Sequence, residues 1–317
     1  ILLQSIRHRY DNSLRILVAD DGGAVDRAVL RAFGAELLTL PPQSGLGHGR
    51  NALVTATRTA FFALLDDDVV FDETTSLETL VGALQRDASA ALAAGCYRDL
   101  RFRRADCFAL RFDAEEDGAV VRARPVPAAR SGCTRVHAAH NFFVARTAVL
   151  ARFGWDPRQR VMEHETFFYQ LLLNAQPVLS CADVSVGHNT TRDNEYRERS
   201  FRLQERRFMQ YLCKNFPELS RFHTPYLQWR CDSRSYCGPA WNAQFPYDGV
   251  QCHPMEWDAG DDRSTVRRPL VTTFIHPEER FPAALRGTSS ADWSRQSRHC
   301  VPLLVLIFTE ERNTARR

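Results

Sequence analysis

The sequence reads Ala60-Phe61-Phe62-Ala63-Leu64-Leu65-Asp66-Asp67-Asp68, a short apolar run that ends on three adjacent aspartates. The apolar run predicts a buried strand. Three neighbouring carboxylates repel one another and destabilise a fold unless a cation compensates them. Mg²⁺ and Mn²⁺ prefer oxygen ligands and also bind phosphates. The stretch therefore indicates a metal–diphosphate site at the end of a strand, with a solvated acidic turn as the alternative.

The same alternation of strand and helix continues on both sides of this stretch. The run 14–19 predicts another buried strand, and it ends on Asp20-Asp21. Further elements follow from apolar spacing: helices over 25–33, 49–58 and 77–84, and strands over 142–144 and 184–186. This order predicts an α/β fold with a mostly parallel sheet flanked by helices. Ligands of such sheets bind beyond the carboxyl ends of the strands, where both acidic clusters fall.

Three more side chains fit a nucleotide site at that end. Asp20 and Asp21 can accept hydrogen bonds from a base N–H or from ribose hydroxyls, although an Asx turn before Gly22 explains them equally. Arg50 lies just inside a helix with a glycine-rich start, where its planar fork can face a phosphate. The alternative for Arg50 is a salt bridge with a carboxylate.

His188, Glu163 and Glu165 are candidates for metal binding and proton transfer. His188 follows the strand 183–187, and a neutral imidazole can complete a Mn²⁺ shell; a structural histidine is the alternative. Glu163 and Glu165 open a helix, where partial desolvation raises a carboxyl pKa and suits a general base. The helix macrodipole alone also favours acids at this position.

Composition narrows the class of protein. The chain has 317 residues, 44% of them hydrophobic, and a net charge of +3, which is typical of a globular protein and too weakly basic for a nucleic-acid binder. No apolar run reaches the roughly 20 residues of a membrane helix, so any membrane anchor is expected outside this chain. Nine cysteines favour a secretory lumen and a few disulfides, with a reduced cytoplasmic protein as the alternative.

The sequence divides into three parts. Residues 1–215 carry the α/β pattern, including a charged amphipathic helix over 195–213, and residues 216–300 read as a loop-rich appendage. Residues 301–317 begin with a strong buried strand, Val301 to Phe308, which would supply the first strand that the beginning of the chain lacks. A circular permutation or a cut tandem array would explain this order, and an unrelated edge strand is the alternative. The first two predict that 303–308 pairs beside 14–19.

A series of short motifs in one order resembles a known family. The motifs are Asp20-Asp21, Gly47-His48-Gly49-Arg50-Asn51, Asp66-Asp67-Asp68, Asn141-Phe142-Phe143-Val144-Ala145-Arg146, Phe153-Gly154-Trp155-Asp156-Pro157-Arg158, Glu163-His164-Glu165-Thr166-Phe167-Phe168 and Asp183-Val184-Ser185-Val186-Gly187-His188. Together they resemble GT-A fold glycosyltransferases, and most of all the family-2-like β-1,4-N-acetylgalactosaminyltransferases that make gangliosides. The resemblance covers 1–215, and 301–317 is similar to that family's opening strand.

The resemblance implies a UDP-sugar donor carrying GalNAc or a related sugar, a glycan or glycoconjugate acceptor, Mn²⁺ or Mg²⁺, inverting transfer and a Golgi or secretory location. The site roles that it implies involve residues from every motif. Asp68 and His188 would bind the metal with Asp66 as a further ligand; Asp66 or Asp67 would lie near the ribose; Asp20, Asp21, Arg50, Thr309 and Arg312 would meet the nucleotide; Asn141 and Arg146 would line the sugar pocket; and Glu165, or as second choice Glu163, would be the base.

Two positions depart from the family pattern. Thr166 stands where the ganglioside enzymes have a glutamate before the Phe-Phe pair, and His137 stands where they have an aspartate. These departures keep a non-catalytic sugar-binding module as an alternative. A nucleotidyltransferase of similar fold is another, although a single lysine, Lys214, leaves arginine to supply any triphosphate-binding cluster.

Overall fold

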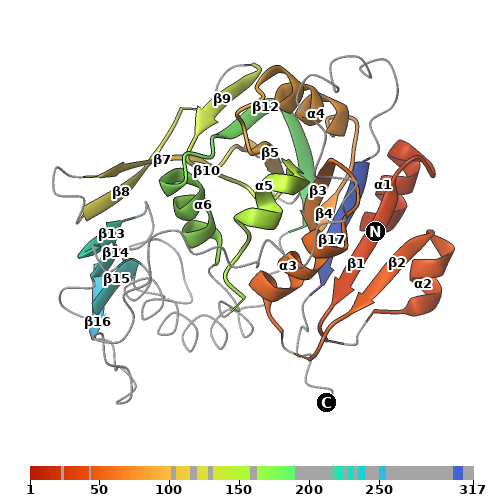
Figure 1. Cartoon of the computed structure of the whole chain (residues 1–317), viewed down its shortest axis with the longest axis horizontal. Helices are drawn as coiled ribbons and strands as arrows, with labels where there is room; N and C mark the ends of the chain where they lie inside the picture. The colour runs from red at the N-terminus through yellow and green to blue at the C-terminus, as the bar shows by residue number, and fades with distance from the viewer. Residues whose placement is uncertain are drawn as a thin grey trace.

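The computed structural model describes most of the first 189 residues and several strands that follow them (Figure 1). The described residues are 1–22, 25–42, 44–100, 105–114, 120–127, 131–157, 163–189, 216, 219–223, 228–230, 235–239, 250–254 and 303–309. The predicted helix over 195–213 and the candidate Arg312 lie outside these residues.

A ten-stranded mixed sheet forms the centre of the molecule. Its strands are β1 (Arg15–Asp20), β2 (Ala35–Thr39), β3 (Phe61–Asp66), β4 (Val69–Val70), β5 (Leu92–Asp99), β6 (Ala105–Asp106), β9 (Cys133–Val136), β11 (Phe143–Arg146), β12 (Val178–His188) and β17 (Leu303–Thr309). The main order is β2-β1-β17-β3-β11-β5-β12-β4. Strands β1, β2, β3, β5, β12 and β17 run in one direction, and β11, which is antiparallel to both of its neighbours, and the short strands β4, β6 and β9 run in the other. The predicted α/β fold is confirmed.

Strand β17 occupies the middle of this sheet and not its edge. It pairs in parallel with β1, where Leu17 lies opposite Leu306, and with β3, where Ala63 lies opposite Val305. Figure 1 shows the strand, in blue, between two strands that come from the beginning of the chain. The predicted pairing of 303–308 beside 14–19 is therefore confirmed, and the edge-strand alternative is wrong.

Six helices among the described residues cover the two faces of the sheet. They are α1 (Leu2–Tyr10), α2 (Arg27–Ala32), α3 (Leu46–Ala56), α4 (Leu77–Arg86), α5 (Thr147–Arg152) and α6 (Glu163–Leu173). Alternate residues of each strand point to opposite faces. Phe62 and Leu64 therefore belong to the core formed with α3, α5 and α6, whereas Ala63 and Leu65 belong to the core formed with α1, α2 and α4. The sheet is thus the middle of three layers.

The boundaries of the helices follow from local side-chain chemistry. The Asp26 side chain accepts a hydrogen bond from the Ala28 N–H at the start of α2, and Ser76 does the same for Thr79 at the start of α4. Such caps satisfy N–H groups that have no partner inside the helix. No helix in the described part of the chain has the length and apolarity needed to cross a lipid bilayer.

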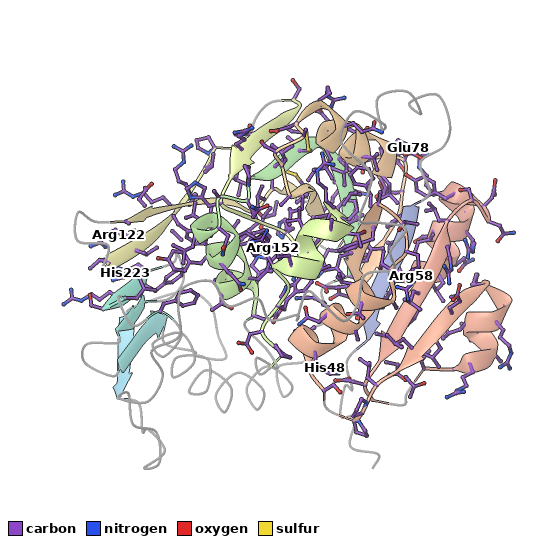
Figure 2. All side chains as sticks on the ribbon, in the orientation of Figure 1. His48, Arg58, Glu78, Arg122, Arg152 and His223 are labelled. Atoms are coloured by element: carbon purple, nitrogen blue, oxygen red, sulfur yellow. A yellow bond between two sulfur atoms is a disulfide. The ribbon has the colours of Figure 1, made fainter. Side chains whose placement is uncertain are left out.

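A second sheet contains strands from both sides of residue 215, where the sequence predicts a domain boundary. Its strands are β7 (Ala109–Ala114), β8 (Val120–Pro125), β10 (Ala138–Ala139), β13 (Arg221–His223), β14 (Gln228–Arg230), β15 (Ser235–Pro239) and β16 (Val250–Pro254). Strand β13 pairs with β8, and Arg122 Nη1 lies 3.1 Å from His223 Nδ1 across this pair of strands (Figure 2). Phe222 packs in the same core as α6. The described part of 216–300 is therefore strand, where the sequence suggested loops.

Two disulfides tie strands of the described region together. Cys96 bonds to Cys107, and Cys133 bonds to Cys181. The first joins β5 to the residue after β6, and the second joins the paired strands β9 and β12. The expectation of a few disulfides is confirmed.

Candidate active site

Polar side chains gather where the parallel strands end, and we call this side of the central sheet its carboxyl end. Asp20 ends β1, Asp66 ends β3 and His188 ends β12. Because these strands share one direction, their last residues reach the same side of the sheet. The buried apolar strands fix the backbone there, and the polar residues that follow them face the space between strand ends and helix starts.

Asp68 and His188 form the pair that best fits a metal. The short strand β4 pairs with β12 so that Val69 lies opposite His188, which brings the preceding Asp68 beside the imidazole. Asp68 Oδ2 lies 3.3 Å from His188 Nε2, and the side chains are 26% and 25% exposed. The hydrogen bond to Asp68 raises the pKa of His188, against the opposing effect of burial.

The three aspartates lie in different surroundings. Asp66 accepts a hydrogen bond of 2.9 Å from Arg50 Nη2, and Asp67 lines a hollow of about 380 Å³ together with Asp68, Asn189 and the first residues of α1. Among the described residues no group of three or more histidine, cysteine or acidic side chains is arranged to hold a metal ion. Arg50 is the partner of the Asp66 carboxylate in this structure, and the prediction that Asp66 joins Asp68 and His188 as a ligand stays a prediction.

Arg50 is buried between two carboxylates. It is 1% exposed, and its guanidinium bonds Glu163 at the start of α6 as well as Asp66. Burial by itself lowers the pKa of Arg50, but the charges of Glu163 and Asp66 outweigh it and raise the pKa above its ordinary value. The salt-bridge alternative for Arg50 is therefore confirmed. Glu163, 3% exposed and paired to this arginine, is unsuited to the role of base.

Asp20 and Asp21 are buried at the end of β1. The Asp20 carboxylate accepts a hydrogen bond from the Gly22 N–H, as the Asx-turn alternative predicts. Asp21 Oδ2 accepts one of 2.9 Å from the Gly45 N–H at the start of α3. Asp21 is 2% exposed, and its Oδ1 has no hydrogen-bond partner within the described ranges. A buried carboxylate oxygen without a partner is costly, so this atom is suited to a ligand donor.

The first turn of α6 carries two titratable groups besides Glu163. Glu165 is partly exposed, and burial raises its pKa to about 7, with a further contribution from the charge of Glu163. His164 Nδ1 lies 2.9 Å from Asn141 Oδ1, and burial lowers the pKa of this histidine to about 3. Glu165 therefore keeps the pKa expected of a general base, whereas His164 is a neutral partner of Asn141.

Arg146 lies at the opposite side of the sheet from Asn141. Because β11 is antiparallel, Arg146 pairs with Phe61, the first residue of β3, whereas Asn141 precedes β11 at the carboxyl end. The Arg146 guanidinium donates to the backbone carbonyls of Leu84 and Ala90 at the end of α4. The prediction that Arg146 lines the sugar pocket is wrong for this reason. Asn141 stays a candidate.

Two further outcomes concern residues that the sequence singled out. Thr309, at the end of β17, lies opposite Asp20 in the backbone register and so reaches the carboxyl end. His137 accepts a hydrogen bond from the Phe112 N–H through Nδ1, which is a structural role. The structure also brings Tyr97 and His140 to the site, against His188, and neither residue stood out in the sequence because no polar cluster surrounds it.

Comparison with known proteins shows what the first part of the chain is similar to. Residues 1–116 match the model of the family described as Glycosyl transferase family 2. Beta-1,4 N-acetylgalactosaminyltransferase 2 of Mus musculus is 29% identical over 192 residues, and Beta-1,4 N-acetylgalactosaminyltransferase 1 of Homo sapiens is 31% identical over 199 residues. Each alignment covers 59% of this chain and 36% of the relative. The chain thus spans about a third of the length of these relatives.

Solved structures with a related arrangement are more distant. GalNAc-T7 with UDP, GalNAc and Mn²⁺ aligns with 61% of this chain and 41% of its own, at 14% identity and a TM-score of 0.44. S. aureus TarS 1–349 in complex with UDP aligns with 62% of this chain and 57% of its own, at 14% identity and a TM-score of 0.42. Residues 1–116 of this chain are thus similar to the glycosyltransferase family 2 model, and the solved structures add no argument of their own.

Proposed function

We propose that the protein is a metal-dependent, inverting glycosyltransferase that moves a sugar from a UDP-sugar to a hydroxyl of a glycan or glycoconjugate. The observation that carries this proposal is the Asp68–His188 pair, which shares the carboxyl end of the sheet with the buried, half-satisfied Asp21. A carboxylate and a neutral imidazole suit Mn²⁺, and two protein ligands leave room for diphosphate oxygens. The family 2 match of residues 1–116 supports the same class of reaction.

Each residue of the donor side has a defined task. Asp68 and His188 would hold Mn²⁺ or Mg²⁺, which when bound neutralises the charge that builds on the leaving UDP. Asp21 Oδ1 would accept a hydrogen bond from the uracil N–H or a ribose hydroxyl and so lose its desolvation penalty. Arg50 would act indirectly, because it fixes Asp66 and the start of α6 and does not face the donor.

The acceptor side depends on Glu165. With a pKa of about 7, its carboxylate is half-populated at neutral pH and can take the proton of the acceptor hydroxyl. The acceptor oxygen then forms the new bond to the anomeric carbon on the face opposite to UDP, and the sugar–phosphate bond breaks with its electron pair going to UDP. Thr166 is not an alternative base, since its hydroxyl donates to the Glu163 carbonyl inside the helix.

Two finer assignments belong to this proposal. The donor sugar would be GalNAc, because the relatives at 29% and 31% identity are named N-acetylgalactosaminyltransferases, and Asn141 would lie in its pocket. The protein would act in the oxidising lumen of the secretory pathway. The Cys96–Cys107 and Cys133–Cys181 disulfides support this location, since such bonds are rare in reducing compartments.

The decisive experiment measures UDP binding and transfer together. We expect UDP to raise the melting temperature of the protein only in the presence of Mn²⁺, as specific binding to the folded state does. Asp68→Asn should abolish this metal-dependent shift and sugar transfer, whereas Asp113→Asn, on the outer side of the second sheet, should change neither. A metal-dependent shift that survives Asp68→Asn would refute the assigned role.

A non-catalytic sugar-binding module is the second candidate, because both family acids are replaced by residues with structural contacts, Thr166 and His137. The two candidates differ in one product. An enzyme releases free UDP from UDP-GalNAc when Mn²⁺ and acceptor, or water, are present, whereas a binding module shows the melting shift and releases none.

A further inference from the structure

Three aromatic side chains stack in a row across the carboxyl end of the sheet. The ring of Tyr97 lies between the imidazoles of His140 and His188, with centroid separations of 4.1 Å and 4.6 Å. The planes are inclined by only 16° and 21°, so both contacts are stacked. We call His140, Tyr97 and His188 the ring stack. Its last member is the imidazole that meets Asp68.

The sheet register places the inner contact of this row. Tyr97 lies opposite Val186 in the β5–β12 ladder, so His188, two residues further on, is its diagonal neighbour on the same face. On its other side β5 pairs with β6, where Asp106 lies opposite Tyr97. His140, in the segment between β10 and β11, stacks on the Tyr97 ring from outside these ladders. Backbone pairing therefore brings Tyr97 to His188, and the stacking contact of His140 completes the row.

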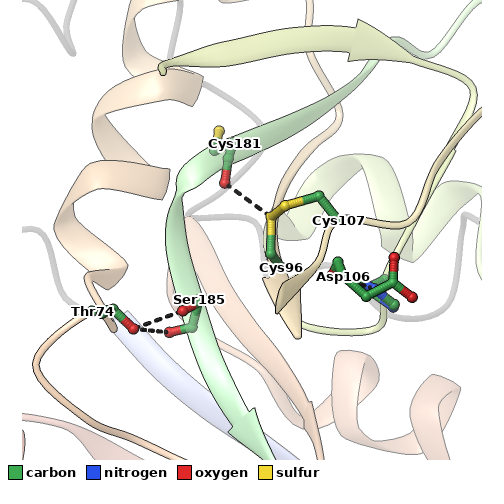
Figure 3. The surroundings of a disulfide bond; sticks show 7 residues. Thr74, Cys96, Asp106, Cys107, Cys181 and Ser185 are labelled. Carbon is green, nitrogen blue, oxygen red and sulfur yellow. Dashed lines mark hydrogen bonds between the residues drawn. A yellow bond between two sulfur atoms is a disulfide. The ribbon is translucent and has the colours of Figure 1, made fainter. Parts of the chain in front are cut away.

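The outer member of the stack is held by the backbone of β6. His140 Nε2 lies 2.9 Å from the carbonyl oxygen of Asp106. Asp106 pairs with Tyr97 across the β5–β6 ladder, and the Cys96–Cys107 disulfide joins the residues next to both of them. Figure 3 shows Asp106 beside this disulfide. The bond thus fixes the carbonyl against which His140 rests.

The Tyr97 hydroxyl is buried at the metal side of the stack. It has no hydrogen-bond partner among the residues that the structure describes, although the Asp66 carboxylate is close enough to interact with it. Burial and the charges of Asp66 and Asp68 raise the pKa of Tyr97 well above its ordinary value, so the hydroxyl keeps its proton. The ring that faces His188 is thus part of a buried side chain.

We propose that Tyr97 and His140 are positioning residues that hold the His188 imidazole in the orientation required for metal binding. A histidine side chain binds a metal well only if its imidazole ring is already held in the right orientation. Substitution of the residues that hold a metal ligand in place commonly lowers the metal affinity 10- to 100-fold. Here the stacked ring of Tyr97, with His140 behind it, would orient the imidazole. This inference rests on the proposed function, because it takes Asp68 and His188 as the metal ligands.

The experiment separates the ring from the hydroxyl of Tyr97. We expect Tyr97→Leu to weaken Mn²⁺ binding, measured by calorimetry at saturating UDP, by about 10-fold or more. Tyr97→Phe keeps the ring and should stay within about twofold of the wild type. Phe112→Leu, which removes a buried aromatic ring from the second sheet, is the matched control for lost packing and should bind Mn²⁺ normally.

A spectroscopic measurement gives a readout that destabilisation alone does not change. Pulsed electron paramagnetic resonance of bound Mn²⁺ should show coupling to an imidazole nitrogen in the wild type and in Tyr97→Phe. At saturating Mn²⁺ we expect this coupling to decrease in Tyr97→Leu. If Tyr97→Leu does not fold, His140→Leu replaces it, with a smaller expected loss of about threefold because one stacked face of Tyr97 is kept.

The outcomes distinguish the two levels of the proposal. Wild-type protein that binds no Mn²⁺ with UDP would refute the metal site, and the ring stack would lose its role with it. Wild-type binding that is unchanged in Tyr97→Leu, or equally weakened in Tyr97→Phe, would leave the metal site intact and refute positioning by stacking. Removal of the Cys96–Cys107 bond by a double alanine substitution should weaken Mn²⁺ binding more than removal of Cys133–Cys181.

Discussion

The two ends of the central sheet each hold an arginine with buried contacts, and the two arginines are used differently. At the carboxyl end, Arg50 bonds the side chains of Asp66 and Glu163. At the opposite, amino end, Arg146 donates to backbone carbonyls at the end of α4 and lies over the ring of Phe61. Arg50 therefore pairs with two carboxylates, whereas Arg146 satisfies backbone carbonyls near the end of α4.

This difference distinguishes the proposed donor site at the carboxyl end from the structural contacts at the amino end. Backbone carbonyls at a helix end need a donor in every state of the protein, so the contacts of Arg146 are structural. Arg50 instead holds carboxylates at the end of the sheet where Asp68 and His188 also meet, which is the site proposed for the donor. Polar groups at the carboxyl end should therefore control activity, whereas those at the amino end should control stability alone.

The largest effect should come from Glu165. Glu165→Gln removes the proposed base and should lower kcat about 10²- to 10⁴-fold, with little change in UDP binding. In the wild type, kcat should fall as the pH drops below about 7, because the carboxylate becomes protonated. Steady-state rates across pH 5–9 test both statements, and a pH profile that is flat in this range would contradict them.

The next effect concerns the buried charges around Arg50. Arg50→Met leaves Glu163 and Asp66 without their cation and should lower the free energy of unfolding by about 3–5 kcal/mol. Adding Glu163→Gln should restore part of this loss, because one of the two uncompensated charges is removed. Urea denaturation of the single and double variants measures the free energy of interaction between Arg50 and Glu163. Equal stability of the two variants would show that the uncompensated charge of Glu163 does not cause the loss.

A smaller effect is expected at the amino end. Arg146→Met leaves the carbonyls of Leu84 and Ala90 without their donor and should lower the free energy of unfolding by about 2 kcal/mol. The specific activity of the folded protein at low temperature should equal that of the wild type. A loss of activity larger than the loss of folded protein would contradict the prediction that Arg146 affects stability alone.

The smallest effect is a pH dependence of stability. The folded pKa of Glu165, about 7, lies above its ordinary value of 4.5, so the folded state binds the proton more tightly. The stability that this gives is fully present below pH 4.5 and is lost as the pH rises through 7. The shift corresponds to roughly 2.5 kcal/mol between pH 5 and pH 8, and solvent screening of this partly exposed side chain reduces the gain expected for Glu165→Gln relative to the wild type to about 1 kcal/mol. Melting temperatures at the two pH values provide the measurement, and an unchanged difference would contradict it.

Strand ends were the most predictable part of the site. Apolar runs that stop at Asp20, Asp66 and His188 reveal both a buried strand and the polar residue that ends it, so the sequence alone brings these residues to one end of the sheet. An apolar run does not indicate whether the strand is parallel or antiparallel to its neighbours in the sheet. The stretch Phe143–Arg146 looks the same in either direction, and for that reason Arg146 was assigned to the wrong end.

Contacts between distant segments were not predictable from periodicity. Arg50 and Glu163 are 113 residues apart, and a helix start rich in acids gives no sign of its partner. Tyr97, inside β5, and His140, between β10 and β11, are single aromatic residues in the sequence, and only the folded sheet places Tyr97 between His140 and His188. Register, which depends on the whole sheet, decides these contacts.

The central position of β17 has a consequence for how the molecule reaches its native state. Until residues 303–309 arrive, β1 and β3 have no neighbour between them, and each exposes a row of unpaired backbone groups. The strand must search for this slot after a long intervening segment has been synthesised, and such non-local pairing slows folding. The β1–β17–β3 pairing thus forms only after residues 303–309 have been synthesised.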